Sequence, residues 1–177
     1  MTSKNLFFKL MMEDLKRKFW AIGLAFLSFF FSMPVNVAMS ISNLQRTYRS
    51  WITNGTTFGE GITADIRYGQ KLLGIVETTV GLENVLNAAV IAAASIIMAL
   101  TGFMYLHSRK QVDFYHSIPV RREVLFAVKY ANGILIIMSM YLLNMILAMG
   151  ILGVNGVGLS AYGSAALITV IVHLGGF

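Results

Sequence analysis

Three ionisable side chains fall close together near the middle of the sequence: His107, Asp113 and His116. Asp113 and His116 are three residues apart, a spacing that puts two side chains on one face of a helix. Histidine and aspartate both bind metal ions, but a metal site needs three or four converging ligands. Polar residues on the surface of a helix give the same pattern. We favour this second interpretation and predict no metal site.

Other patterns typical of catalysis are absent from the sequence. There is no cysteine, which excludes disulfides, thiolate metal ligands and cysteine nucleophiles. No Gly-x-x-x-x-Gly-Lys-Ser/Thr segment occurs, so any ATP hydrolysis must come from a partner chain. No Ser/His/Asp order or pair of intramembrane carboxylates is present, and the one deep ionisable residue, His173, lies near the chain end. We therefore expect no enzyme activity and no bound cofactor.

The composition indicates which elements must position the polar residues. Apolar residues make up 56% of the 177 residues and charged residues only 12%, about half the usual charged fraction of a soluble domain. The apolar residues form long runs, and about 20 of them in a helix cross the hydrocarbon layer. We predict an all-α, polytopic membrane bundle of about four spans. The predicted spans are residues 20–41, 85–106, 124–151 and 160–177.

The fourth run is still apolar at Phe177, so we expect this chain to be the N-terminal piece of a longer protein. The basic balance of +6 could indicate nucleic-acid binding, but the Lys and Arg residues flank apolar runs rather than forming a basic stripe. Membrane topology is the better explanation, and we expect no nucleic-acid partner.

Residues 3–19 have the pattern of an amphipathic helix lying in the membrane interface, or of a charged lead-in to the first span. Its opposite charges recur four residues apart, as in Asp14 and Lys18, a spacing that allows ion pairs. A cleaved signal peptide is the alternative for the first run. The basic region is too long for one, and no clean small-x-small cleavage site follows.

Some residues inside the spans have specific expectations. Pro34 should kink the first span. Asn36, Asn132 and Asn144 should bond between helices. In the second span, small residues recur at three- and four-residue steps, which favours close helix packing, although alanine is common in such spans. These small residues are Ala88, Ala92, Ser95, Ala99 and Gly102.

The loops predict an orientation. Five Lys and Arg residues precede the first span and four lie in the 107–123 loop, whereas the Gly/Asn turn between the third and fourth spans has none. In the long polar segment 42–84, which contains a possible short helix near 65–76, four basic residues are offset by four acidic ones. The positive-inside rule then puts the N-terminus and the 107–123 loop in the cytoplasm.

The 107–123 loop carries the most information about function. Ser108 and Gln111 match a capping box, so a short helix is predicted over 109–116, and Pro119 suits the first turn of the next helix. Exposed Phe114 and Tyr115 would give this short helix a partner surface. The alternative is a solvated loop whose aromatic residues lie at the lipid interface.

The stretch 105–126 resembles the signature of a bacterial group of ATP-binding-cassette permeases in the ABC-2 membrane family. Arg109 and Lys110, then Gln-Val-Asp-Phe-Tyr-His-Ser, Ile118, Pro119 and Arg121-Arg122-Glu123 match that signature in order and without gaps. The match covers about an eighth of the chain. The remainder agrees in its layout: interfacial helix, span, outer segment, span, cytoplasmic helix, span.

The resemblance implies a site and several partners. The short cytoplasmic helix would be the coupling helix that docks on a separate ATPase subunit, and the N-terminal helix would be the elbow helix. Two permease halves, alike or different, would assemble in the bacterial cytoplasmic membrane with two ATPases that bind the ATP. The family has six spans, more than this chain has. The implied partner-binding residues are Arg109, Lys110, Val112, Phe114, Tyr115, His116, Ile118, Arg121 and Arg122.

The function implied is that of a permease subunit of an ATP-driven transporter, an exporter in our interpretation. Two alternatives remain. A secondary transporter or channel would place ionisable groups or broken helices at mid-membrane. A membrane-anchored sensory or interaction protein would use 42–84 as its outer binding part.

Overall fold

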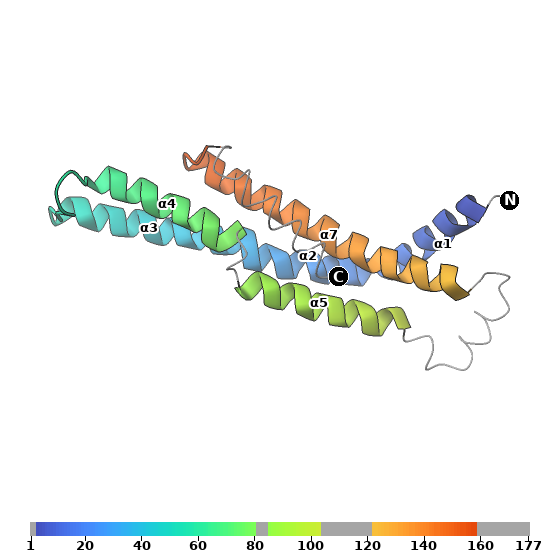
Figure 1. Ribbon diagram of the computed structural model, residues 1–177. Helices are drawn as coiled ribbons and strands as arrows, with labels where there is room; N and C mark the ends of the chain where they lie inside the picture. The colour runs from blue at the N-terminus through green and yellow to red at the C-terminus, as the bar shows by residue number, and fades with distance from the viewer. Residues whose placement is uncertain (1–2, 81–84, 104–121, 159–177) are drawn as a thin grey trace. The chain divides into compact units, whose positions relative to one another are not determined.

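The computed structural model describes residues 3–80, 85–103 and 122–158, and this part of the chain is helical, with no strand. The predicted all-α fold class is therefore confirmed. The elements in chain order are α1 (Ser3–Arg17), α2 (Phe19–Phe30), a π-helical turn (Phe31–Val35), α3 (Asn36–Thr53), α4 (Ala64–Val80), α5 (Val85–Phe103) and α7 (Arg122–Val154) (Figure 1).

Two stretches of helix are long and apolar enough to cross a membrane: Phe19–Thr53 and Glu123–Val154. The apolar part of α5, Val85–Thr101, is shorter. The two long helices contain the first and third predicted spans, and α5 covers residues 85–103 of the second. Residues 104–106 and the fourth predicted span, 160–177, lie outside the described residues. Two long apolar helices support a membrane location for the chain.

The first long helix differs from its prediction in where it ends. Residues 20–41 were expected to form a span followed by a polar segment, but the helix continues without interruption to Thr53. At 1.5 Å per residue it is about 50 Å long, against about 30 Å of hydrocarbon. The polar last third, which includes Arg46 and Arg49, must therefore extend beyond the lipid core. A hydropathy pattern marks where the helix leaves the lipid, not where it ends.

Pro34 is accommodated in a π-helical turn (Phe31–Val35). Proline cannot donate an i→i−4 hydrogen bond, and its ring crowds the preceding turn, so a local widening is the expected response. The buried side chains along this helix are spaced about four residues apart: Ala21, Ala25, Phe29, Met33, Val37, Ile41 and Leu44. Each four-residue step overshoots an α-helical turn by about 40°. A wider turn reverses this drift and keeps the stripe on one face.

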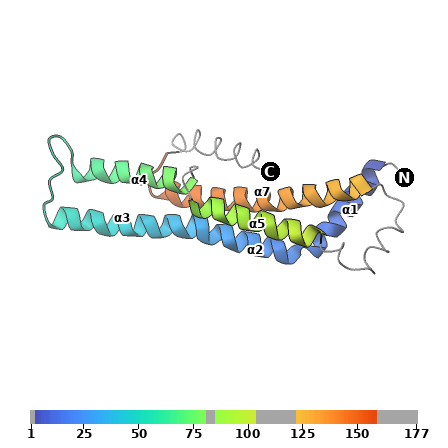
Figure 2. The ribbon, with the colours of Figure 1, turned by 60° about the horizontal axis from the view of Figure 1, so that its bottom comes forward.

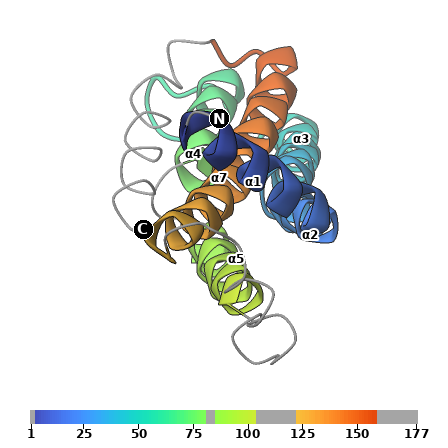
Figure 3. The same cartoon turned by 90° about the vertical axis from the view of Figure 1, so that its right-hand side faces the viewer.

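The chain divides into two compact units. Unit 1 comprises Met1–Ser28 and Ala89–Tyr141, and unit 2 comprises Phe29–Ala88 and Leu142–Phe177. In unit 1, α1 lies beside the first part of α7 (Figure 3). Helices α2, α5 and α7 contribute residues to both units.

In unit 2, α3 and α4 form an antiparallel helical hairpin, which the views in Figure 1 and Figure 2 both show. The possible short helix near 65–76 is confirmed and is longer than expected. Asn54 and Gly55 end α3: Gly55 adopts φ 61°, and the Thr56 N–H donates to the Trp51 carbonyl at 3.0 Å. This is the Schellman arrangement, which needs a left-handed residue where glycine is most easily accommodated.

The small residues on α5 do not form one buried stripe among the residues whose burial is described. Ala88, Ala92 and Ala99 are exposed and Ser95 is half-buried, whereas Asn87, Ala94 and Met98 are buried. Polar bonding explains the orientation at the start of α5, in unit 2. The Ser32 hydroxyl donates to Asn87 Oδ1, and Asn87 Nδ2 donates to the Thr79 carbonyl at 3.0 Å. Because a buried amide must keep its hydrogen bonds, the Asn87 face turns inward.

Candidate functional site

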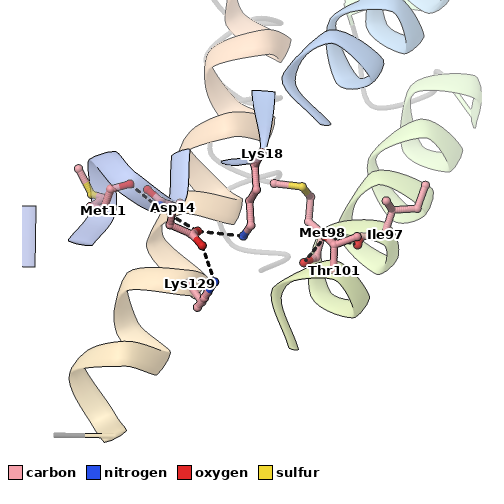
Figure 4. A network of polar contacts seen from close by, with 8 residues as sticks. Met11, Asp14, Lys18, Ile97, Met98, Thr101 and Lys129 are labelled. Carbon is pink, nitrogen blue, oxygen red and sulfur yellow. Dashed lines mark hydrogen bonds and ion pairs between the residues drawn. The ribbon is translucent and has the colours of Figure 1, made fainter. Parts of the chain in front are cut away.

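The clearest concentration of buried charge in the described part of the chain lies in unit 1, where α1 meets α7. Asp14 of α1 receives a hydrogen bond from the Lys129 ammonium of α7, and the Lys18 ammonium lies 3.2 Å from the same carboxylate. Figure 4 shows both ammonium groups directed at Asp14. Asn132 donates to Asp14 Oδ2 at 3.1 Å and to the Met11 carbonyl at 3.0 Å. We call Asp14, Lys18, Lys129 and Asn132 the ion cluster.

Helical spacing explains why these four side chains converge. Lys129 and Asn132 are three residues apart on α7, and Asp14 and Lys18 are four apart, so each pair occupies one helix face. Lys18 follows the end of α1, and its N–H donates to the Asp14 carbonyl at 3.2 Å. The helical course of the backbone therefore continues past Arg17 far enough to hold both side chains of the predicted i,i+4 pair together.

The burial of the cluster was not expected. The side chains of Lys18, Asp14 and Lys129 are 7%, 8% and 11% exposed, and Asn132 is fully buried. By contrast, Lys16 and Glu13 of the same helix pair at 3.3 Å with side chains 70% and 56% exposed. The Asp14–Lys18 pair is thus buried and the Glu13–Lys16 pair exposed. The sequence spacing predicted the Asp14–Lys18 pair but gave no indication of its burial.

The charge of Asp14 is maintained by its neighbours. Burial by itself would raise the pKa of the carboxyl group. The hydrogen bonds from Lys129 and Asn132, together with the positive charges of Lys129 and Lys18, outweigh this effect and hold the pKa below its ordinary value of 3.8. At neutral pH Asp14 is therefore a carboxylate.

The arrangement can fix two helices to each other. Its carboxylate is engaged by both ammonium groups and by the Asn132 amide. Removing one partner from a buried ion pair leaves an uncompensated charge, which costs about 3–5 kcal/mol. The cluster therefore holds α1 against the first three turns of α7.

The predicted partner-binding residues fall almost entirely outside the described part of the chain. Arg122 begins α7. The other eight are outside the described residues: Arg109, Lys110, Val112, Phe114, Tyr115, His116, Ile118 and Arg121. The predicted helix over 109–116 and the polar triad of His107, Asp113 and His116 also lie outside them, as does His173. Within the described ranges, no group of three His, Asp or Glu side chains could hold a metal ion.

Polar residues of α3 and α7 can be compared with their expectations. Glu123 lies in the first turn of α7. Asn132 bonds to another helix, as expected. Asn36 does not follow this expectation, because its side chain accepts a 3.5 Å hydrogen bond from Ser40 of the same helix.

Sequence reasoning missed the pairing of Lys129 with Asp14. Lys129 lies in an otherwise uncharged stretch of an apolar helix. Because a charge near the lipid requires a counter-charge, its isolation was the clue to a partner on another helix. The i,i+4 spacing of Asp14 and Lys18 gave no indication that a third charge joins them.

Comparison with protein-family models, curated proteins and solved structures finds no match to this chain.

Proposed function

We propose that this chain is the membrane-spanning permease subunit of an ATP-binding-cassette transporter, an exporter of the ABC-2 type. The observation that carries the proposal is the segment 105–126, with its gap-free run of paired basic, aromatic and proline residues between two apolar helices. ATP would be bound and hydrolysed by a separate ATPase, and this chain would act as a transport subunit rather than an enzyme.

The arrangement of unit 1 supports this proposal. The C-terminal end of α5 and the N-terminal end of α7 point toward the same end of the unit, where α1 also lies (Figure 1, Figure 2). The two helix ends that border residues 104–121 therefore lie on the side of unit 1 occupied by the N-terminal helix. This is the topology expected of an elbow helix and a coupling helix that share the cytoplasmic face of a multi-pass protein in the bacterial cytoplasmic membrane.

In the proposed mechanism, closure of the ATPase nucleotide sites moves the coupling helix, and the spans rearrange around the substrate path. A second permease half, identical or different, completes that path. The ion cluster would transmit the motion, because Lys129 lies seven residues after Arg122 and is bound to Asp14 of α1. A displacement of the start of α7 then also displaces the interfacial helix.

Co-purification from detergent tests the proposal. The full-length protein is tagged and expressed with the ATPase encoded beside its gene, and the two should elute together. Phe114→Ala/Tyr115→Ala should abolish retention of the ATPase while leaving membrane insertion intact. Lys16→Met is the matched control, since Lys16 is an exposed charge on α1 outside the docking segment. Failure of the unaltered protein to retain the ATPase would refute the proposal.

One observation favours a second candidate, a secondary transporter or channel. Charged residues buried among membrane helices often mark ion pathways, and the ion cluster is such a group. Transport into vesicles that persists without ATP, and that Asp14→Asn abolishes, would support this second function over the first.

A further inference from the structure

The α3–α4 hairpin of unit 2 contains a shallow depression of about 530 Å³. Its lining comes from the last turns of α3 and the first turns of α4: Gln45, Tyr48, Arg49, Asp65 and Tyr68. Small-molecule sites generally have volumes of roughly 300–1,000 Å³. The depression is therefore large enough for a small ligand.

The lining side chains are not a structural core. Gln45, Arg49 and Asp65 are exposed, and Tyr48 and Tyr68 are half-buried. They belong to the part of the first long helix that extends beyond the lipid core and to the helix that returns beside it. Two charged groups and two tyrosines in an exposed hollow are consequently available to a ligand in water.

The geometry of the lining separates two kinds of contact. The Tyr48 hydroxyl donates to the Asp65 carboxylate, and the Tyr48 and Tyr68 rings lie 4.9 Å apart at 56°. A carboxylate beside two tyrosine rings is suited to an ammonium group, through charge pairing and cation–π attraction. The guanidinium of Arg49 is suited to a carboxylate or phosphate, which it can meet with paired N–H donors.

We propose that this depression binds a small zwitterion, with its ammonium group at Asp65 and the tyrosine rings and its anionic group at Arg49. A simple cation would meet repulsion from Arg49, and a simple anion would meet repulsion from Asp65. A zwitterion satisfies both charges and leaves the site neutral. The side-chain carbonyl of Gln45 can accept a further hydrogen bond, since its Nε2 donates to Asn155 at 3.3 Å.

The proposal is independent of the proposed transport function, because binding to the hairpin requires neither an ATPase nor a second permease half. Retention of the ATPase reports on residues 105–126, and zwitterion binding reports on residues 45–68. Either result can therefore fail while the other holds.

The chain has two tryptophans, Trp20 and Trp51, which makes a direct binding assay possible. Trp51 lies one turn beyond Tyr48 on α3, with its ring centroid 5.4 Å from the Lys71 ammonium. In Trp20→Phe protein, purified in a maltoside detergent, Trp51 is the sole fluorescent tryptophan. Phosphocholine serves as the zwitterionic probe, and choline and inorganic phosphate each carry one half of its charges. Equilibrium dialysis with labelled phosphocholine gives a second readout that does not depend on fluorescence.

We expect saturable phosphocholine binding, with choline and phosphate each binding at least about tenfold more weakly. Choline lacks the anionic group that Arg49 would bind with paired N–H donors. Phosphate lacks the cation that would pair with Asp65 and the tyrosine rings. Asp65→Asn and Arg49→Gln should each weaken phosphocholine binding by about tenfold. Arg46→Gln is the matched control, an exposed arginine one turn earlier on α3 that does not line the depression, and it should bind normally. Helix content by circular dichroism verifies that each variant is folded.

Three results would overturn the proposal. The first is no saturable binding by dialysis to folded, unaltered protein. The second is equal binding by the Asp65→Asn, Arg49→Gln and Arg46→Gln variants. The third is phosphate or choline binding as tightly as phosphocholine, which would make the hollow a site for a single charge.

Discussion

The ion cluster in unit 1 and the α3–α4 hairpin in unit 2 use the same residue types in opposite ways. In the cluster, Asp14, Lys18 and Lys129 are almost completely buried and directed at one another. In the hairpin, Arg49 and Asp65 are exposed, and the carboxylate is engaged by a tyrosine rather than by a cation. Burial, not residue type, therefore separates a charge that holds helices together from one available to a ligand.

This difference has an energetic consequence. A charge removed from water depends on its partner, so deleting the partner is expensive. An exposed charge is stabilised by solvent, and a surface pair contributes about 0–1 kcal/mol. Substitutions in the two regions should therefore differ in stability cost by several-fold, even where the residues removed are chemically identical.

The largest effect is expected for Asp14→Asn. The substitution removes the carboxylate that the buried Lys18 and Lys129 ammonium groups contact, so the free energy of unfolding in detergent should fall by about 3 kcal/mol. Lys129→Met should cost less, because Lys18 still neutralises Asp14. Thermal unfolding followed by circular dichroism measures both variants.

The neighbouring acid provides the matched control for this comparison. Glu13→Gln removes an exposed ion pair with Lys16 on the same helix and should change the free energy of unfolding by less than about 1 kcal/mol. Equal losses for Asp14→Asn and Glu13→Gln would contradict the distinction between buried and exposed charge.

Acid should remove part of the same stabilisation. Because the pKa of Asp14 is held below 3.8 in the folded chain, its contribution is fully present above about pH 4 and is lost as pH falls through the lower, folded pKa. The unaltered protein should therefore lose more stability between pH 7 and pH 3 than Asp14→Asn does. Thermal unfolding of both proteins at pH 7 and pH 3 gives the stability that each loses. Identical losses in the two proteins would show that Asp14 is not stabilised as a carboxylate.

A smaller effect is expected in the core of unit 2. Ser32→Ala leaves the buried Asn87 Oδ1 without its hydroxyl donor, which should cost about 1–2 kcal/mol. Ser28→Ala is the control, because that hydroxyl donates to the Leu24 carbonyl of its own exposed helix turn at 2.9 Å. Chemical denaturation measures the free energy of unfolding of both variants, and Ser32→Ala should lose more than Ser28→Ala. No change in Ser32→Ala would argue against a structural role for the Ser32–Asn87 bond.

The sequence predicted helices well and burial poorly. Apolar runs predicted the two long apolar helices among the described residues, because the requirement to fill about 30 Å of hydrocarbon dominates composition. Helix ends were less predictable. Helix α3 continues as a polar helix to Thr53, because its packing against α4 stabilises helical turns where the hydropathy pattern predicted a polar segment outside the span. Two features follow from contacts between residues that are far apart in the sequence. The Ser32–Asn87 bond turns the alanines at the start of α5 outward, and the Asp14–Lys129 bond brings the ion cluster together. Spacing within one helix cannot reveal such contacts.

The smallest effect is expected for Tyr48→Phe, which removes the hydroxyl bonded to Asp65 in the hairpin. Because this hydroxyl and carboxylate can both bond to water instead, we expect no measurable change in the unfolding midpoint. The substitution keeps the ring beside Tyr68 but frees the Asp65 carboxylate. Phosphocholine affinity should therefore stay the same or increase slightly. Equilibrium dialysis measures this affinity in parallel with that of Asp65→Asn, which should bind phosphocholine more weakly. A loss of stability comparable to that of Ser32→Ala would mean that the hairpin charges hold the fold together, as those of the ion cluster do, and are not available to a ligand.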